Sequence, residues 1–325
     1  MDRIFLTLAC GDYDRTKALR DGTVLPEGIR INYLVSESEE IFWRMIKYQE
    51  FDAAEMSLSN YITMHSYGDC PFVAIPVFLS RFFRHSCLYI NTRAGIESPA
   101  DLKGKRIGNT RYSMTAAVWV RGFLKDDYGV APTDAQWFAG GQEEPGRRER
   151  LTIQVPPEIK LSAIPEDKTL SGLLEAGEID ALIAARIPSC YAKGSAGVAR
   201  LFPNYKETEI DYYRRTKIFP IMHAFVIKKE LQERHHWIAQ SLYRAFLSAK
   251  ERSMEAMRAS LTPVCMIPWL GAEIEQLDNI FGEDWWPYGV ESNRPTLEAL
   301  IRYMGEQGLL GGTVKVDDLF PVIRD

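Results

Sequence analysis

The fold is indicated most clearly by one stretch, Ala100-Asp-Leu-Lys-Gly-Lys-Arg-Ile-Gly108. It predicts a turn followed by a strand, and the residues from Thr110 to Thr115 then lead into a helix that runs past Trp119 and Phe123. This turn, strand and helix belong to a strand–helix pattern that begins near Asn91. We infer that a strand–helix pattern restarts there.

The residues before this stretch have the same organisation. The ranges 4–9, 29–35 and 51–56 predict strands, and a helix is expected after each of them, which favours a parallel α/β sheet. Further along, an apolar strand at 218–227 is followed by a long amphipathic helix. The segment 140–157 is polar, rich in glycine and proline and without a period, so we expect a long functional loop there.

The bulk composition excludes several classes of protein. At 325 residues the chain is long enough for two domains, or one large one, each with its own core. Hydrophobic residues make up 46% and charged residues 26%, as in ordinary globular proteins. The net charge of -5 argues against a nucleic-acid binder, and no apolar run is long enough to predict a membrane span.

The sequence also bears on compartment and cofactors. The first ten residues lack the basic leader of a signal peptide, and the five cysteines form no CxxC pair, so we expect a cytoplasmic protein without disulfides or structural zinc. Motifs for catalytic zinc, nucleotide phosphates, dinucleotides and pyridoxal phosphate are missing, so no cofactor is expected. A carboxylate–histidine metal site assembled across a cleft stays open, and the sequence is compatible with a homo-oligomer.

One apolar stretch, Val77 to Asn91, contains charged residues where a buried strand would have none. Arg81, Arg84 and His85 lie in its middle. One interpretation is an edge strand with solvated arginines and a histidine bonded to a backbone carbonyl. The other is a strand that meets an anionic ligand, because the planar guanidinium fork matches a carboxylate and histidine can move a proton near neutral pH.

The stretch Ala100 to Gly108 resembles the turn that opens the second lobe of type II periplasmic-binding-protein folds. In that fold the chain crosses twice between two α/β lobes, and the ligand binds in the cleft between them. The resemblance implies one lobe from residues 1–90 and 222–325 and a second lobe from residues 91–221. It places the two crossings near Asn91 and Ile221.

More specific motifs run in order along the chain and resemble the 4,5-dihydroxyphthalate decarboxylase family. They are Arg81-Phe-Phe-Arg-His-Ser86, Thr115-Ala-Ala-Val-Trp-Val-Arg-Gly122, Asp127-Tyr-Gly-Val130, Gly140-Gly-Gln-Glu-Glu-Pro-Gly146, Gly177-Glu-Ile-Asp-Ala181, Ile218-Phe-Pro-Ile-Met-His223 and Trp286-Pro-Tyr-Gly289. The resemblance implies a cytoplasmic, non-oxidative carboxy-lyase that converts 4,5-dihydroxyphthalate, or a close analogue, to protocatechuate and CO2. The alternative is a non-catalytic solute-binding protein that delivers an aromatic carboxylate to a transporter or sensor.

Under this resemblance, cations and a helix start are the candidate binding groups for a small aromatic carboxylate. We expect Arg81, Arg84 and Arg111 to hold its carboxylates. Free N–H groups and the helix dipole at a strand-to-helix turn suit a second carboxylate subsite. The residues expected there are Asn109, Arg111, Ser113 and Met114. For Ser113 or Thr115 the alternative role is that of a helix cap.

The proton-transfer groups are expected on the edges of the strands. His85 is the favoured proton donor and His223 the second choice, although His223 could equally be a satisfied core histidine. Glu55 ends a strand at its carboxyl edge, where open α/β sheets place ligands, and is a candidate partner for a phenolic hydroxyl. Arg186 follows a strand of the second part on the equivalent edge. Trp286 could stack on a substrate ring, but packing among the C-terminal helices is favoured.

Overall fold

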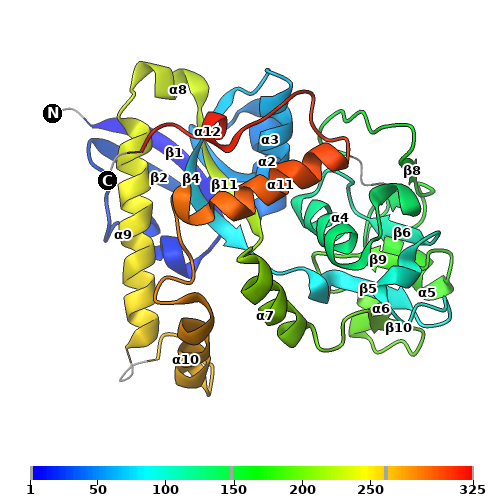
Figure 1. Ribbon diagram of the computed structural model, residues 1–325. Helices are drawn as coiled ribbons and strands as arrows, with labels where there is room; N and C mark the ends of the chain where they lie inside the picture. The colour runs from blue at the N-terminus through cyan, green and yellow to red at the C-terminus, as the bar shows by residue number, and fades with distance from the viewer. Residues whose placement is uncertain (1–2, 147–148, 260–262, 324–325) are drawn as a thin grey trace.

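The computed structural model describes residues 3–146, 149–259 and 263–323. Its backbone is organised around two separate β-sheets, with helices packed on both (Figure 1). The first sheet has five strands in the order β2-β1-β3-β11-β4, and the second has six in the order β10-β5-β9-β6-β7-β8.

The first sheet contains the three strands predicted near the N-terminus and one that returns from far along the chain. Its strands are β1 (Ile4–Cys10), β2 (Ile29–Val35), β3 (Ala53–Ser57), β4 (Phe72–Arg81) and β11 (Ile221–Lys228). Strand β1 pairs in parallel with β2 and β3, whereas β11 runs antiparallel between β3 and β4. Every residue of β3 is buried, as expected for a strand covered on both faces.

The second sheet begins with the strand that follows β4. It contains β5 (Leu88–Asn91), β6 (Arg106–Asn109), β7 (Gln136–Ala139), β8 (Lys160–Ala163), β9 (Ala181–Ile183) and β10 (Val198–Arg200). Strands β9, β6, β7 and β8 pair in parallel, whereas β5 is antiparallel to β9 and β10. The strand predicted within Ala100 to Gly108 is thus β6, which lies between β9 and β7 near the centre of this sheet.

The helices follow the strand–helix alternation of the sequence. Those near the first sheet are α1 (Lys17–Arg20), α2 (Ser38–Tyr48), α3 (Leu58–Ser66), α8 (Lys229–Arg234), α9 (Ile238–Arg258), α10 (Leu270–Phe281), α11 (Arg294–Glu306) and α12 (Val316–Leu319). The others are α4 (Thr115–Tyr128), α5 (Leu170–Ala176), α6 (Ser189–Ala192) and α7 (Tyr205–Thr216). Figure 1 shows α11 extending from the first sheet to α4 at the second.

The composition of the stretch from Val77 to Asn91 predicted one buried strand, but the structure shows two strands joined by a crossing. Strand β4 ends at Arg81, residues 82–87 cross to the second sheet through a short 3-10 turn (His85–Cys87), and β5 begins at Leu88. The pattern misled because the crossing begins with two phenylalanines and its residues 84–87 are buried, so hydrophobic periodicity does not distinguish it from a buried strand.

The chain changes sheets twice, between Arg81 and Leu88 and between Arg200 and Ile221. The division into lobes at residues 90 and 221 stays a prediction, and β5, which falls at its first boundary, pairs with strands of the second sheet. The two crossings contact each other, because the Phe82 N–H donates to the Pro220 carbonyl over 3.1 Å.

Candidate functional site

A cavity of about 850 Å³ lies between elements of the two sheets. Helix α2 contributes Glu39, Trp43, Ile46 and Lys47, and the turn between β6 and α4 contributes Thr110, Arg111 and Met114. The remaining walls come from 141–146, Glu149, Arg150 and 185–187. Its volume suits a small organic ligand. The segment 140–157, predicted to be a functional loop, therefore does line a cavity.

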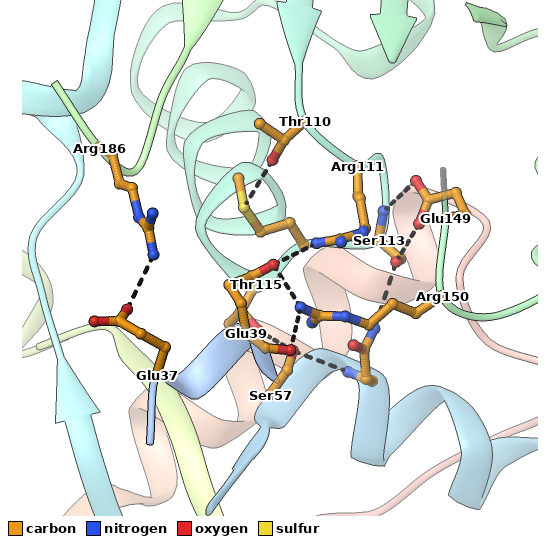
Figure 2. A network of polar contacts seen from close by, with 12 residues as sticks. Glu37, Glu39, Ser57, Thr110, Arg111, Ser113, Thr115, Glu149, Arg150 and Arg186 are labelled. Atoms are coloured by element: carbon orange, nitrogen blue, oxygen red, sulfur yellow. Dashed lines mark hydrogen bonds and ion pairs between the residues drawn. The ribbon is translucent and has the colours of Figure 1, made fainter. Parts of the chain in front are cut away.

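Two arginines on one side of this cavity both bind a carboxylate that belongs to the other side. Arg111 donates from Nη1 to Glu39 Oε2 over 2.7 Å, and Arg150 donates to the same oxygen (Figure 2). Arg111 is buried, and the side chain of Arg150 is 7% exposed. Because Glu39 belongs to α2 and the arginines follow β6 and β7, these ion pairs join the two halves of the molecule. A carboxylate ligand would be attracted to the same pair of cations.

A second carboxylate lies at the start of α4. Glu149 Oε2 accepts a hydrogen bond of 2.7 Å from the Ser113 hydroxyl (Figure 2). Its Oε1 accepts from the Tyr112 and Ser113 N–H groups. Tyr112 and Ser113 belong to the turn that leads into α4, which begins at Thr115, so these N–H groups come from the turn and not from the first residues of the helix. The turn holds a carboxylate of the chain itself, and the expected subsite for a ligand carboxylate stays a prediction.

The start of α3 faces the start of α4 through a cluster of hydroxyl groups. Ser57 Oγ lies 3.0 Å from Thr115 Oγ1, and Ser59 donates to the Ser113 carbonyl over 2.6 Å. Thr115 Oγ1 also accepts from the Ser59 N–H. Both helix starts are thus close together beside the cavity, although α3 follows a strand of the first sheet and α4 a strand of the second.

An acid–base pair stands on the strands beneath this cluster. His223 Nδ1 lies 2.6 Å from Glu55 Oε1, and Glu55 is fully buried. Tyr13 donates to Glu55 Oε1 over 2.6 Å, and the Gly11 N–H donates to Oε2 over 3.0 Å. Burial alone would raise the pKa of Glu55, but the charge and hydrogen bond of His223, together with the Tyr13 and Gly11 donors, lower it below its usual value.

This arrangement fixes the tautomer of His223. Because ionised Glu55 only accepts hydrogen bonds, Nδ1 carries the proton, and Nε2 is left to bind or deliver another. Nε2 has no hydrogen-bond partner within the described residues, and the side chain is 20% exposed. Phe42 packs edge-on against the imidazole at 4.8 Å, and the Arg150 guanidinium lies over the same phenyl ring at 5.2 Å. Phe42 thus lies between His223 and Arg150, which lines the cavity.

The structure places His85, the favoured proton donor, away from this site. Its ring stacks on Phe123 at 4.1 Å, contacts Phe202 and Tyr212 edge-on and is 1% exposed. Burial, with a smaller effect from the charge of Arg215, lowers the pKa of His85 to about 4. A histidine enclosed by aromatic rings and hard to protonate is unsuited to the expected role. The crossing carries it into the core between α4 and α7.

Arg81 and Arg84 are also absent from the described walls of the cavity. Arg81 is buried and donates to the carbonyls of Phe219 and Pro287 and to the Asn293 side chain. Arg84 donates to two sulfur atoms, Met222 Sδ at 3.2 Å and Cys87 Sγ at 3.5 Å. Arg81 thus joins the end of β4 to Phe219 of the second crossing and to the C-terminal part of the chain, and Arg84 joins the first crossing to β11, so both cations have structural partners.

Some of the other predicted binding residues line the cavity, and some do not. Arg111, Met114 and Arg186 line the cavity, and Arg186 pairs with Glu37 over 3.1 Å at the surface (Figure 2). Asn109 is fully buried at the end of β6, and neither polar atom of its side chain has a partner in the part of the chain that the structure describes. Trp286 donates to the Phe78 carbonyl over 2.8 Å and stacks on Arg15, so it packs, as favoured.

Sequence reasoning missed four residues of the site, Tyr13, Glu39, Glu149 and Arg150. Tyr13 follows the first strand, so the rule that ligands lie at the carboxyl edge could have drawn attention to it. Glu149 and Arg150 fall in the loop that was singled out, but no motif indicated which of its charged residues turn inward. Among the residues described, no group of three or more His, Cys, Asp or Glu side chains could hold a metal ion, and no helix is long and apolar enough to cross a membrane.

Comparison with known proteins identifies the family. No protein-family model matches the chain. A 4,5-dihydroxyphthalate decarboxylase of Comamonas testosteroni is 37% identical over 320 residues, which cover 98% of this chain and 97% of the relative. The chain belongs to the 4,5-dihydroxyphthalate decarboxylase family. A second member, from Pseudomonas putida, is 42% identical over 214 residues, or 66% of this chain and 83% of the relative.

Solved structures confirm the predicted fold of this 4,5-dihydroxyphthalate decarboxylase family member. The periplasmic aliphatic sulphonate binding protein SsuA of Escherichia coli superposes with a TM-score of 0.54 at 14% identity, covering 97% of each chain. A putative periplasmic sulfonate-binding protein of Methylobacillus flagellatus gives a TM-score of 0.53 at 12% identity, covering 98% of this chain and 92% of that one. The expected two-lobed, type II periplasmic-binding-protein fold is thus present.

Proposed function

We propose that this protein is a carboxy-lyase that removes one carboxylate from 4,5-dihydroxyphthalate, or a close analogue, to give protocatechuate and CO2 without oxidation. Membership of the family and the names of both relatives support this activity. The observation that carries it is the Glu55–His223 pair, with its free Nε2, beside a cavity lined by arginines. We propose a small aromatic dicarboxylate as the ligand.

The reaction needs a proton at the carbon that loses CO2. Breaking the aryl–carboxylate bond directly would leave an aryl anion without stabilisation. If that ring carbon is protonated first, the hydroxyl para to it supplies electrons, releases its proton to water and becomes a ketone. The bond to the carboxylate then breaks, its electron pair returns to the ring, and the oxygen takes a proton back from water to restore the hydroxyl. One proton is taken up and one CO2 leaves for each product molecule.

The residues of the site fit these steps. His223 in its charged form donates from Nε2 to the ring carbon, and Glu55 stabilises that charge and orients the imidazole. Positioned acid–base groups typically contribute about 10²–10⁴-fold. Arg111 and Arg150 line the cavity and attract the carboxylates of the substrate. Holding the ring in this orientation supplies a further part of the rate enhancement.

The non-catalytic alternative has less support. A solute-binding protein for an aromatic carboxylate would need the arginines and the helix starts. It would not need a buried carboxylate that accepts from Tyr13 and Gly11 and fixes the tautomer of a partly exposed histidine. No observation specifically favours that alternative.

A product assay tests the proposal. Purified protein is incubated with 4,5-dihydroxyphthalate, and protocatechuate and CO2 are quantified together. The two should form in equal amounts, and in D2O deuterium should appear at the vacated ring carbon. Phthalate, which lacks the hydroxyls that supply electrons, should bind without losing CO2. Binding of both compounds with release of CO2 from neither would identify a binding protein instead.

A further inference from the structure

Glu149 is held in an unusual way for a carboxylate beside a cavity rich in arginine. Within the described residues its hydrogen-bond partners are uncharged donors in the turn before α4, namely the N–H groups of Tyr112 and Ser113 and the Ser113 hydroxyl. Within the described residues, no Lys, Arg or His lies in ion-pair range of it, whereas its neighbour Arg150 binds Glu39. A side chain from a loop thus fills an anion-binding turn more than thirty residues earlier in the chain.

A buried cation beneath the same turn gives an independent sign that it is built for an anion. Arg121, on α4, is 1% exposed, and its guanidinium lies 3.8 Å from the centre of the Tyr112 ring. It donates to Gln307 Oε1 over 2.7 Å and to the Tyr112 carbonyl, and its Nη1 is buried without a partner among the residues described. No carboxylate of the described chain pairs with it.

The charge of Arg121 reaches the turn through one peptide group. Arg121 donates to the Tyr112 carbonyl, and the N–H of that same peptide, on Ser113, donates to Glu149. Hydrogen bonds in such a chain polarise one another, so the cation strengthens the donor that faces the carboxylate. An uncompensated buried charge is costly, and an anion in this turn offsets part of that cost. Burial lowers the pKa of Arg121, while the charges of Tyr112 and Glu149 act in the opposite direction.

We propose that this turn is the subsite for the carboxylate that the substrate retains, and that Glu149 is its built-in occupant, which leaves when the substrate binds. The inference rests on the proposed function for the identity of the substrate. Glu149 presents the same two oxygens as an aromatic carboxylate, and it reaches the turn from a wall of the cavity. Glu149 therefore competes with the substrate for the turn. The apparent affinity for substrate is proportional to the fraction of molecules in which Glu149 has left the turn.

Phthalate binding tests this occupant directly. Phthalate carries both carboxylates but lacks the hydroxyls needed for turnover, so its dissociation constant can be measured by calorimetry in the wild type, in Glu149→Gln and in Glu149→Ala. Both variants should bind phthalate at least about fivefold more tightly, because the competing charge is gone. The matched control is Glu158→Gln, an exposed glutamate of the same loop, which should bind like the wild type.

Turnover of 4,5-dihydroxyphthalate supplies the second readout. The Glu149 variants should show a lower KM with kcat within about twofold, since Glu149 has left the subsite at saturation. Equal or weaker phthalate binding in both variants would overturn the proposal, as would a tenfold loss of kcat at unchanged affinity. Absence of phthalate binding in all four proteins would refute the subsite. Tighter phthalate binding in the variants without any turnover would leave the subsite intact and reject the decarboxylase activity.

Discussion

His223 and Glu55 act as a unit because each determines the state of the other. The carboxylate accepts from Nδ1 at 2.6 Å and thereby directs Nε2 outward, and the imidazole keeps the buried carboxylate ionised. Tyr13 adds a third member, since its hydroxyl donates to the same oxygen of Glu55. We therefore regard Tyr13 as a positioning residue, which acts on the substrate through Glu55 and His223.

Replacing Tyr13 by phenylalanine should move the pH dependence of the reaction. The hydroxyl is one of the donors that lower the pKa of Glu55, so its removal should raise that pKa and shift the acidic limb of the kcat/KM profile to higher pH. A lost hydrogen bond to a charged group costs about 1.5–3 kcal/mol, which corresponds to a fall in kcat/KM of roughly tenfold or more. Tyr67→Phe, at an exposed tyrosine, is the control, and a profile identical to the wild type would contradict the role.

Some of these residues could be predicted and others could not, for a physical reason. Glu55, His223 and Arg111 were named from the sequence because strand ends and strand-to-helix turns are recognisable from hydrophobic periodicity. Tyr13 and Glu149 escaped because their contacts depend on loop conformations that no period reports. Glu55 was expected to bind a hydroxyl of the substrate, but its carboxylate is bonded to Tyr13 and His223.

At the scale of elements, the crossing from β4 to β5 is where sequence and structure diverge most. Strand periods and the turn before β6 predicted the α/β class correctly. However, periodicity cannot separate a buried connection from a buried strand, so His85 was expected at the ligand. The structure instead packs it between Phe123 of α4 and Tyr212 of α7, 3.9 Å from Glu209 Oε1.

His85 and Glu209 should make opposite contributions to the pH dependence of stability. Burial lowers the pKa of His85 to about 4, so the unfolded chain binds this proton more readily and stability is lost as pH falls below about 6.5. Burial raises the pKa of Glu209 to about 7, so the native chain binds that proton more readily and stability is lost as pH rises from about 4.5 to 7. In the wild type the two effects largely cancel.

Single substitutions should expose these two slopes. When the pH is lowered from 7 to 5, the melting temperature of His85→Gln should rise relative to that of the wild type, because only the effect of Glu209 remains. Glu209→Gln should lose stability over the same interval. Melting temperatures at both pH values provide the measurement, with His236→Gln, at an exposed histidine, as the control. Slopes of the same sign in both variants would rule out this explanation.

At the scale of the whole molecule, helix α11 links the two halves on the side of α4. The Tyr303 hydroxyl donates to Asp126 over 2.7 Å, and its ring packs edge-on against Trp119. Trp119 in turn donates to the Ile221 carbonyl at the second crossing over 3.0 Å. The turn that holds Glu149 leads directly into α4, which makes this contact, so we expect the position of the candidate site to depend on how closely α11 packs.

Gly122 makes this close packing possible, and adding one methyl group should disturb it. A Cβ at this position would overlap the ring of Tyr303, which is 1% exposed and fixed by Asp126. Overpacking of this kind costs about 1–3 kcal/mol. We expect Gly122→Ala to lower the free energy of unfolding despite a gain in helix propensity of up to about 1 kcal/mol. Denaturant unfolding measures it, and Gly197→Ala, where a Cβ meets nothing within 4 Å, is the control. A variant as stable as the wild type would contradict the role of this contact.

A single-turnover experiment tests most directly whether His223 donates the proton to the ring carbon. Protein in excess over 4,5-dihydroxyphthalate is mixed rapidly, and the formation of protocatechuate is followed in the wild type, in His223→Gln and in His236→Gln. We predict that His223→Gln slows the chemical step by at least about 100-fold, keeps phthalate binding within about tenfold, and that His236→Gln behaves like the wild type. A His223→Gln protein that forms product at a near-normal rate would contradict it.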